Sequence, residues 1–123
     1  MLREKIFKEL DEHFVKDMLM TREPILNENE RHYNDEHLYM IFICSEEGVL
    51  RILIRNWRTN HSFSKNVVID INVIFELSKK NLVSFIKETV YQNSGVESRD
   101  MLNDWYEIKK VEIRDKKISD LGI

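Results

Sequence analysis

Residues 37–57 read HLYMIFICSEEGVLRILIRNW, and this stretch decides the fold class. Two runs of mostly apolar, alternating residues flank the polar tetrapeptide SEEG at residues 45–48. Side chains in a β-strand point alternately to opposite faces, and a short polar break that ends in glycine is typical of a tight turn. The stretch therefore predicts a β-hairpin with strands over residues 37–44 and 49–57.

The register of this hairpin depends on which residues form the turn. If Glu46 and Glu47 are the two turn residues, one face is wholly apolar and is expected to be core. On that face Ile43 pairs with Leu50, Ile41 with Ile52, and Tyr39 with Ile54. The opposite face is mixed, and on it Phe42 pairs with Arg51, Met40 with Leu53, and Leu38 with Arg55.

Residues 2–20 and 66–77 predict a helix and a strand on either side of the hairpin. The first segment repeats apolar side chains about every four positions and has no glycine or proline, which favours an amphipathic helix. The second has six apolar residues of one parity, which favours a third strand. A second helix is predicted over residues 78–92, with Ser78 as its N-cap and Gly95 as a left-handed helix end.

The remaining segments carry weaker patterns. Residues 21–36 lack periodicity around the single proline and are expected to form a surface loop, with at most one turn of helix. A short helical turn is expected over residues 99–104, a fourth strand over residues 106–113, and fraying over the last eight residues. The expected fold is one α+β domain over residues 1–123. It is a small antiparallel meander of three to four strands, packed with an N-terminal helix and a second helix after the third strand.

The amino-acid composition already narrows the classes of partner and the location that are expected for this chain. The chain has 123 residues, 42% hydrophobic and 33% charged, with a net charge of −3, which is an ordinary balance for one folded domain. A slightly acidic chain is not expected to bind nucleic acid or membrane through charge alone. The longest apolar run is Leu38–Cys44, and the single cysteine cannot form an internal disulfide, so a cytoplasmic location is expected. The absence of alanine and the abundance of Ile, Asn, Lys and Glu suggest a low-GC bacterium or its phage as the source.

The second hairpin strand places arginines around a tryptophan. Three interpretations stay open: a solvated strand face, a protein interface, and a single-stranded nucleic-acid site that uses Arg51, Arg55, Arg58 and Trp57. The interface interpretation is preferred, because Trp and Arg often dominate binding energy and the expected neighbours are apolar. Its candidate residues are Arg51, Leu53, Arg55, Trp57, Arg58, Met40 and Phe42.

A second candidate surface is acidic and could approach a basic partner. Its residues are Glu28, Glu30, Asp35, Glu36, Glu46 and Glu47. Within the same stretch, His32, Asp35 and His37 are the weaker candidates for a metal site, as in a small metal-dependent hydrolase or nuclease, but their spacing matches no metal-binding template. Cys44 is expected to be a buried, inert thiol.

These observations predict a protein that binds rather than catalyses. No catalytic residue and no cofactor are expected. The preferred interpretation is a non-catalytic protein-binding module, such as a small bacterial or phage accessory protein of the immunity, inhibitor or anti-defence type. Its expected partner is another protein or a second copy of itself, with single-stranded nucleic acid and the metal-dependent enzyme as the two alternatives.

Overall fold

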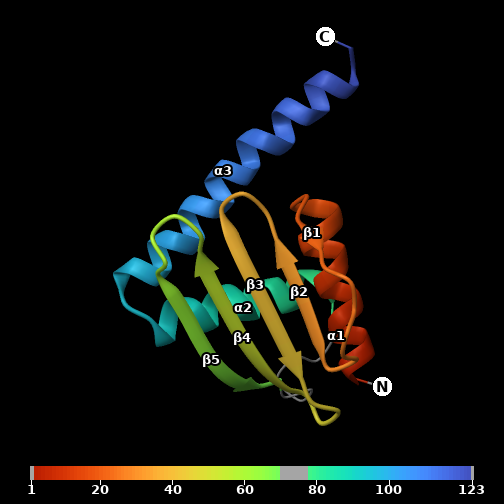
Figure 1. The fold of residues 1–123 in the computed structure, drawn as a ribbon, viewed down its shortest axis with the longest axis vertical. Helices are drawn as coiled ribbons and strands as arrows, with labels where there is room; N and C mark the ends of the chain where they lie inside the picture. Colours follow the sequence, from red (N-terminus) through yellow and green to blue (C-terminus); the bar gives the residue numbers. More distant parts are fainter. Residues whose placement is uncertain (1, 70–77, 123) are drawn as a thin grey trace.

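The structure is a computed structural model that describes residues 2–69 and 78–122. In chain order its elements are α1 (Leu2–Asp11), the π-helical segment η1 (Glu12–Asp17), β1 (Thr21–Arg22), β2 (Glu30–Asn34), β3 (Leu38–Cys44), β4 (Val49–Asn56), β5 (Ser62–Val68), α2 (Lys79–Asn93) and α3 (Val96–Asp120). Each strand pairs antiparallel with the next, so the sheet is a meander in the order β1-β2-β3-β4-β5 (Figure 1).

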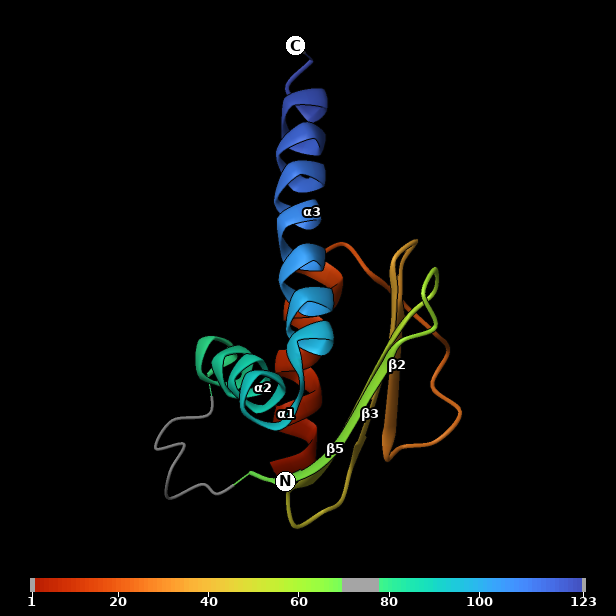
Figure 2. The same cartoon turned by 90° about the vertical axis from the view of Figure 1, so that its left-hand side faces the viewer.

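All three α-helices pack on the same face of the sheet (Figure 2). The core lies between these two layers, where Phe14, Tyr33, Phe42 and Trp105 bury their rings almost completely. Phe14 stacks on Phe42 with 5.4 Å between ring centroids and also approaches Tyr33 and Trp105. Burying large side chains of this kind stabilises a fold by about 1.5–3 kcal/mol each. In residues 2–69 and 78–122, no helix covers the other face of the sheet.

The α+β class, the antiparallel meander and the presence of the first two helices are confirmed. The sheet has five strands where three to four were predicted, and the first helical segment ends at Asp17 instead of residue 20. Every fourth apolar residue of the N-terminal segment, from Ile6 through Leu10 to Phe14, lies in the core as its period predicts. The second helix begins one residue later than predicted, and the Ser78 hydroxyl accepts a 3.2 Å hydrogen bond from the backbone N–H of Asn81, as an N-cap does.

The hairpin register is wrong by one residue. Cys44 pairs with Leu50 and Tyr39 pairs with Arg55, because the turn contains three residues instead of two. Ser45 N–H donates to the Val49 carbonyl at 3.0 Å, and the third turn residue, Gly48, adopts φ of +92°. A three-residue hairpin with glycine in the left-handed region is a common alternative to the two-residue turn. Since neighbouring side chains alternate, the shift exchanges the two faces of β3.

The residues before and after the predicted hairpin also differ from expectation. Residues 21–36 contain β1 and β2, because β2 pairs along its whole length with β3 although only its Tyr33 is buried. Residues 106–113 are helical, inside the long α3, so the predicted fourth strand is wrong. Gly95 is the extended N-cap of α3, with φ of −75°, and is not a left-handed helix end.

The predicted third strand overlaps with β5 only in part. The strand runs from Ser62 to Val68, so it begins four residues earlier than predicted and is the fifth of the sheet. Residues 70–77 of the prediction lie outside the described part of the chain. The second helix therefore follows strand five.

The helix α3 extends well beyond the sheet (Figures 1 and 2). Its first half is anchored in the core by Met101, Leu102 and Trp105. Residues 114–120 are all exposed, and the helix continues to Asp120 although fraying was expected from residue 116 onward. Within the described residues, no helix has the length and apolar character needed to cross a bilayer.

Candidate functional site

The sheet face that carries no helix is the main candidate site, and we call it the outer face. Register places its outward-pointing residues in three rows across β2, β3, β4 and β5. The rows are Glu30–Ile43–Arg51–Asn66, His32–Ile41–Leu53–Ser64 and Asn34–Tyr39–Arg55–Ser62. Each strand therefore contributes one column of a distinct chemical type.

The central column, on β3, is apolar and aromatic. Tyr39, Ile41 and Ile43 are half-buried by their neighbours in the sheet, and Leu53 on β4 continues this patch in the middle row. Trp57, just after β4, is 48% exposed and lies 5.4 Å from the ring of Tyr39, centroid to centroid. A patch of this kind with polar residues around it is the usual composition of a protein interface.

The columns beside β3 carry opposite charges. Arg51 and Arg55 on β4 are exposed, and Arg55 donates a 3.0 Å hydrogen bond to the side chain of Asn60. Arg51 forms no ion pair with any residue in 2–69 or 78–122. On the other side, β2 offers the carboxylate of Glu30, with His32 in the next row. Arg51 and Glu30 stand in the same row but two strand spacings apart, about 10 Å, so they do not neutralise each other.

The structure corrects the predicted membership of this face. Met40 and Phe42 are fully buried under the helices, on the opposite side of the sheet from the arginines, because the register differs by one residue. Tyr39, Ile41 and Ile43 take their place, although they were expected in the core. Arg51, Leu53, Arg55 and Trp57 lie on or beside the outer face as predicted, and Arg58 is exposed in the β4–β5 loop.

His32 is held by two side chains of the outer face. Its Nδ1 lies 2.5 Å from the Tyr39 hydroxyl and its Nε2 lies 3.0 Å from Glu30 Oε2. Since a carboxylate only accepts, the ring donates from Nε2 to Glu30. Burial and the carboxylates of Glu23 and Glu30 raise the pKa of Tyr39, so its hydroxyl stays protonated near neutrality. These bonds fix the β2 side of the outer face.

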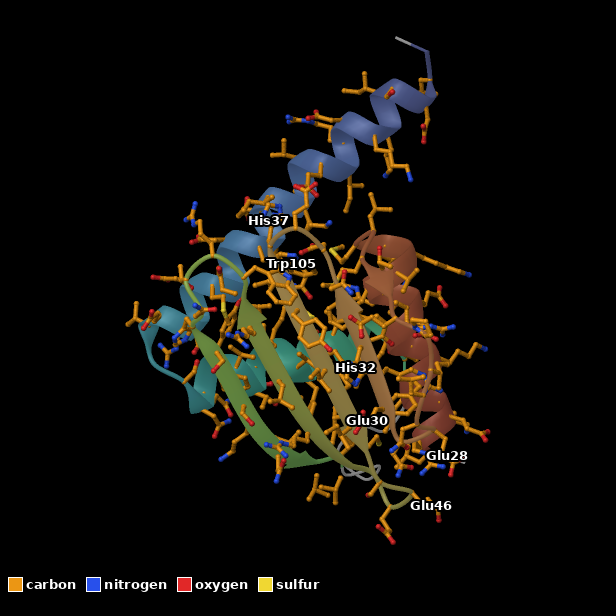
Figure 3. The ribbon with its side chains drawn as sticks, in the orientation of Figure 1. Glu28, Glu30, His32, His37, Glu46 and Trp105 are labelled. Atoms are coloured by element: carbon orange, nitrogen blue, oxygen red, sulfur yellow. The ribbon has the colours of Figure 1, made fainter. Side chains whose placement is uncertain are left out.

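The six residues of the predicted acidic surface do not form one patch. Glu28 and Glu46 are exposed at one end of the sheet (Figure 3). Glu47 is exposed in the same turn as Glu46, whereas Glu36 is exposed in the β2–β3 turn at the other end. Glu28 lies 3.9 Å from Arg3, and Glu30 is engaged by His32. The side chain of Asp35 is largely covered, with 9% of its surface exposed.

Asp35 organises a polar cluster between the β2–β3 turn and α3. It accepts hydrogen bonds of 2.8 Å from Trp105 Nε1 and from the backbone N–H groups of His37 and Leu38. The ammonium of Lys109, only 3% exposed, lies 3.3 Å from its Oδ2. Burial acts to raise the pKa of Asp35, but these donors outweigh it and lower the pKa below the usual value.

The cluster continues along α3 to the surface. The carboxylate of Glu112 lies 3.1 Å from Lys109 Nζ and 3.0 Å from His37 Nε2. The bond from His37, with help from Lys109, lowers the pKa of Glu112. Sequence reasoning missed this cluster. The only available signal was Asp35 itself, since Asp before a strand often accepts bonds from the next backbone N–H groups.

The weaker metal candidates are not brought together. His32 contacts Tyr39 and Glu30, whereas His37 contacts Glu112 and Asp35 contacts Trp105 and Lys109. Among the residues that the structure describes, no group of three His, Cys, Asp or Glu side chains is placed to hold a metal ion. Cys44 is buried, and burial raises the pKa of its thiol, which disfavours the nucleophilic thiolate.

Two of the hollows in the described part of the chain lie beside α1 and beside Trp105, away from the outer face. A groove of about 760 Å³ runs between α1 and the β1–β2 edge, and Arg31 in its wall stacks 4.3 Å above the ring of Phe7. A smaller hollow of about 320 Å³ lies beside Trp105, between α3 and the start of the β4–β5 loop. Neither contains an arrangement of nucleophile, base and orienting group.

Comparison with protein-family models, with curated proteins and with solved structures finds no match to this chain. Function is therefore argued from the residues of the outer face.

Proposed function

We propose that this chain is a non-catalytic protein-binding module that uses the outer face of its sheet. One observation carries the proposal. All three α-helices cover the same side of the sheet, so the apolar column on β3 stays in contact with solvent together with Leu53 and Trp57. Partly uncovered apolar side chains ringed by charged ones favour association with another protein surface.

The arrangement around this column supports protein over nucleic acid as the partner. Arg51 and Arg55 flank the column on one side, but Glu30 and Glu23 lie on the other and would repel a phosphate backbone. The aromatic pair of Tyr39 and Trp57 is the feature that a single strand would use for base stacking. If single-stranded DNA quenched Trp57 fluorescence with a steep salt dependence, nucleic acid would replace protein as the proposed partner.

The test uses a substitution in the middle of the face. Leu53→Asp places a charge at the centre of the outer face but leaves the helical side unaltered, and Trp57→Ala removes an exposed ring. The control is Val111→Asp, which adds the same charge at a 47% exposed position of α3. Immobilised wild-type and variant proteins are incubated with host extract, and light scattering measures the mass of each purified protein.

We expect wild type and Val111→Asp to bind the same partner protein or to form the same oligomer. Leu53→Asp and Trp57→Ala should lose this binding while their circular dichroism spectra stay unchanged. Association and mass that were the same in all four proteins would contradict the proposal.

A further inference from the structure

We propose that the partner of the outer face is a second copy of this chain, packed face to face about a two-fold axis that runs along β3. This inference rests on the proposed function and adds the identity of the partner. It is carried by one row of the outer face, Glu30–Ile43–Arg51, in which opposite charges stand at equal distances on either side of the apolar column on β3.

A two-fold axis along the strand direction has a simple consequence for the rows. Rotation about it exchanges the β2 side of one copy with the β4 side of the other but keeps each row at its height. Because Glu30, Ile43 and Arg51 share one row, Glu30 of each copy faces Arg51 of the other, and the two Ile43 side chains meet on the axis. Two symmetric pairs of opposite charge then flank an apolar centre, as expected for an isologous interface.

The perpendicular orientation is electrostatically unfavourable. A two-fold axis across the strands would lay β4 on β4 and reverse the order of the rows, so Arg51 of one copy would face Arg55 of the other. Like charges in direct opposition are destabilising. The charge pattern thus selects one of the two face-to-face arrangements.

The margins of the face fit the same arrangement. The segment between β1 and β2 runs along the β2 margin and carries Leu26, whose side chain is 96% exposed. On the opposite margin, β5 ends at Val68, which is 65% exposed beside Val49 at 40%. The axis along β3 brings the β2 margin of one copy over the β5 margin of the other, so these exposed apolar residues lie on facing margins.

The experiment is a charge exchange between the two sides. Glu30→Arg and Arg51→Glu are purified separately, and their mass is measured by sedimentation across a concentration series, alone and as an equimolar mixture. Lys80→Glu, which makes the same charge change as Arg51→Glu on the helical side, is the control.

We expect wild type and Lys80→Glu to dimerise, and each outer-face variant alone to dimerise at least about tenfold more weakly, because its copies oppose like charges. The mixture is expected to recover the wild-type affinity as a heterodimer, since the base introduced at position 30 meets the acid introduced at position 51. The bond between Glu30 and His32 is lost in Glu30→Arg and kept in Arg51→Glu. Loss of this bond alone would weaken the mixture as well, so recovery of affinity in the mixture reports on the charges that face each other across the interface.

Two outcomes would overturn the inference. If wild type were a monomer at every concentration while Leu53→Asp still abolished binding to a host protein, the second copy would be excluded but the protein-binding function would stand. If neither charge variant altered the dimer of the wild type, the copies would pair through another surface, such as the edge of β5, and the inference would be wrong.

Discussion

The indole Nε1 of Trp105 donates a 2.8 Å hydrogen bond to Oδ2 of Asp35, and this bond joins α3 to the turn between β2 and β3. Trp105 and Lys109 are buried, and the side chain of Asp35 keeps only 9% of its surface exposed. A buried charge is tolerated when opposite charges and donors surround it, and becomes costly when one partner is lost. The Asp35 carboxylate thus adds a polar anchor to the apolar contacts that hold the first half of α3 in the core.

Asp35→Ala should lower the free energy of unfolding by about 3 kcal/mol, because it leaves Lys109 with only Glu112 as a counter-charge and removes the acceptor of Trp105. Urea unfolding followed by tryptophan fluorescence measures the change. Glu36→Ala, at the exposed neighbouring position, should change it by less than about 0.5 kcal/mol. In the double variant Asp35→Ala with Lys109→Met, the loss should be smaller than the sum of the two single losses. Strict additivity would show that the pair does not interact.

The free energy of unfolding should fall as the pH decreases from 6.5 to 5, a range in which most carboxylates are still ionised. The cause is His13. Burial lowers the pKa of His13 to about 4, against the opposing effect of Asp17, and its Nε2 lies 2.8 Å from the Tyr106 hydroxyl. The folded protein therefore keeps this ring neutral, whereas the unfolded chain protonates it near pH 6.5. Stability from this group is complete above pH 6.5 and decreases as the pH falls, by about 2 kcal/mol at pH 5.

His13→Gln should flatten this part of the profile, measured as urea midpoints between pH 7 and pH 5. The lowered pKa values of Asp35 and Glu112 act in the same direction but only near and below the usual values of 3.8 and 4.5. If the urea midpoint of His13→Gln still fell between pH 6.5 and pH 5, the pH dependence would belong to a group other than His13.

Gly48→Ala should destabilise the protein by about 1–2 kcal/mol, because φ of +92° is strained for any residue with a β-carbon. The added carbon would also stand 2.6 Å from Cδ2 of Leu2, which must move aside. Thermal unfolding measures the loss, with Glu47→Ala in the same turn as the control. Equal melting temperatures for the two variants would contradict the role assigned to Gly48.

Ending the chain after Ile113 should cost less than about 1 kcal/mol of stability, because residues 114–122 are exposed and belong only to the free part of α3. Ending it after Ile108 should be severe, since that variant also lacks Lys109 and Glu112 and leaves Asp35 without its buried cation. Circular dichroism and urea unfolding compare the two. Similar stabilities would show that the polar cluster does not anchor α3.

Helices with a clear local repeat of apolar residues were predicted correctly from the sequence. Elements that are stabilised by contacts with residues distant in the chain were missed. The four-residue period of Ile6, Leu10 and Phe14 and the cap at Ser78 are local signals, and both helices are found where these signals predict. The polar strand β2 has no such signal, because it is stabilised by pairing with β3. Strand-forming residues such as Tyr106 and Val111 are helical because Trp105 and Lys109 are bound by Asp35, about 70 positions earlier in the chain.

The candidate site was predicted only in part, for one geometric reason. The parity of β4 was correct, so Arg51, Leu53 and Arg55 were placed on one face as observed. The turn was assigned two residues where it has three, and this single-residue error exchanged Ile41 for Phe42. Both turn lengths suit the sequence SEEG, and tertiary packing decides between them.

The long α3 helix has a practical consequence. Its exposed end, near Asp120, rises from the helical layer and leads away from the sheet (Figure 2). Ten residues of helix beyond Lys110 correspond to about 15 Å of rigid spacer. A dye or a surface tether attached there would leave the opposite side of the molecule unobstructed, which makes this helix a natural handle for single-molecule measurements.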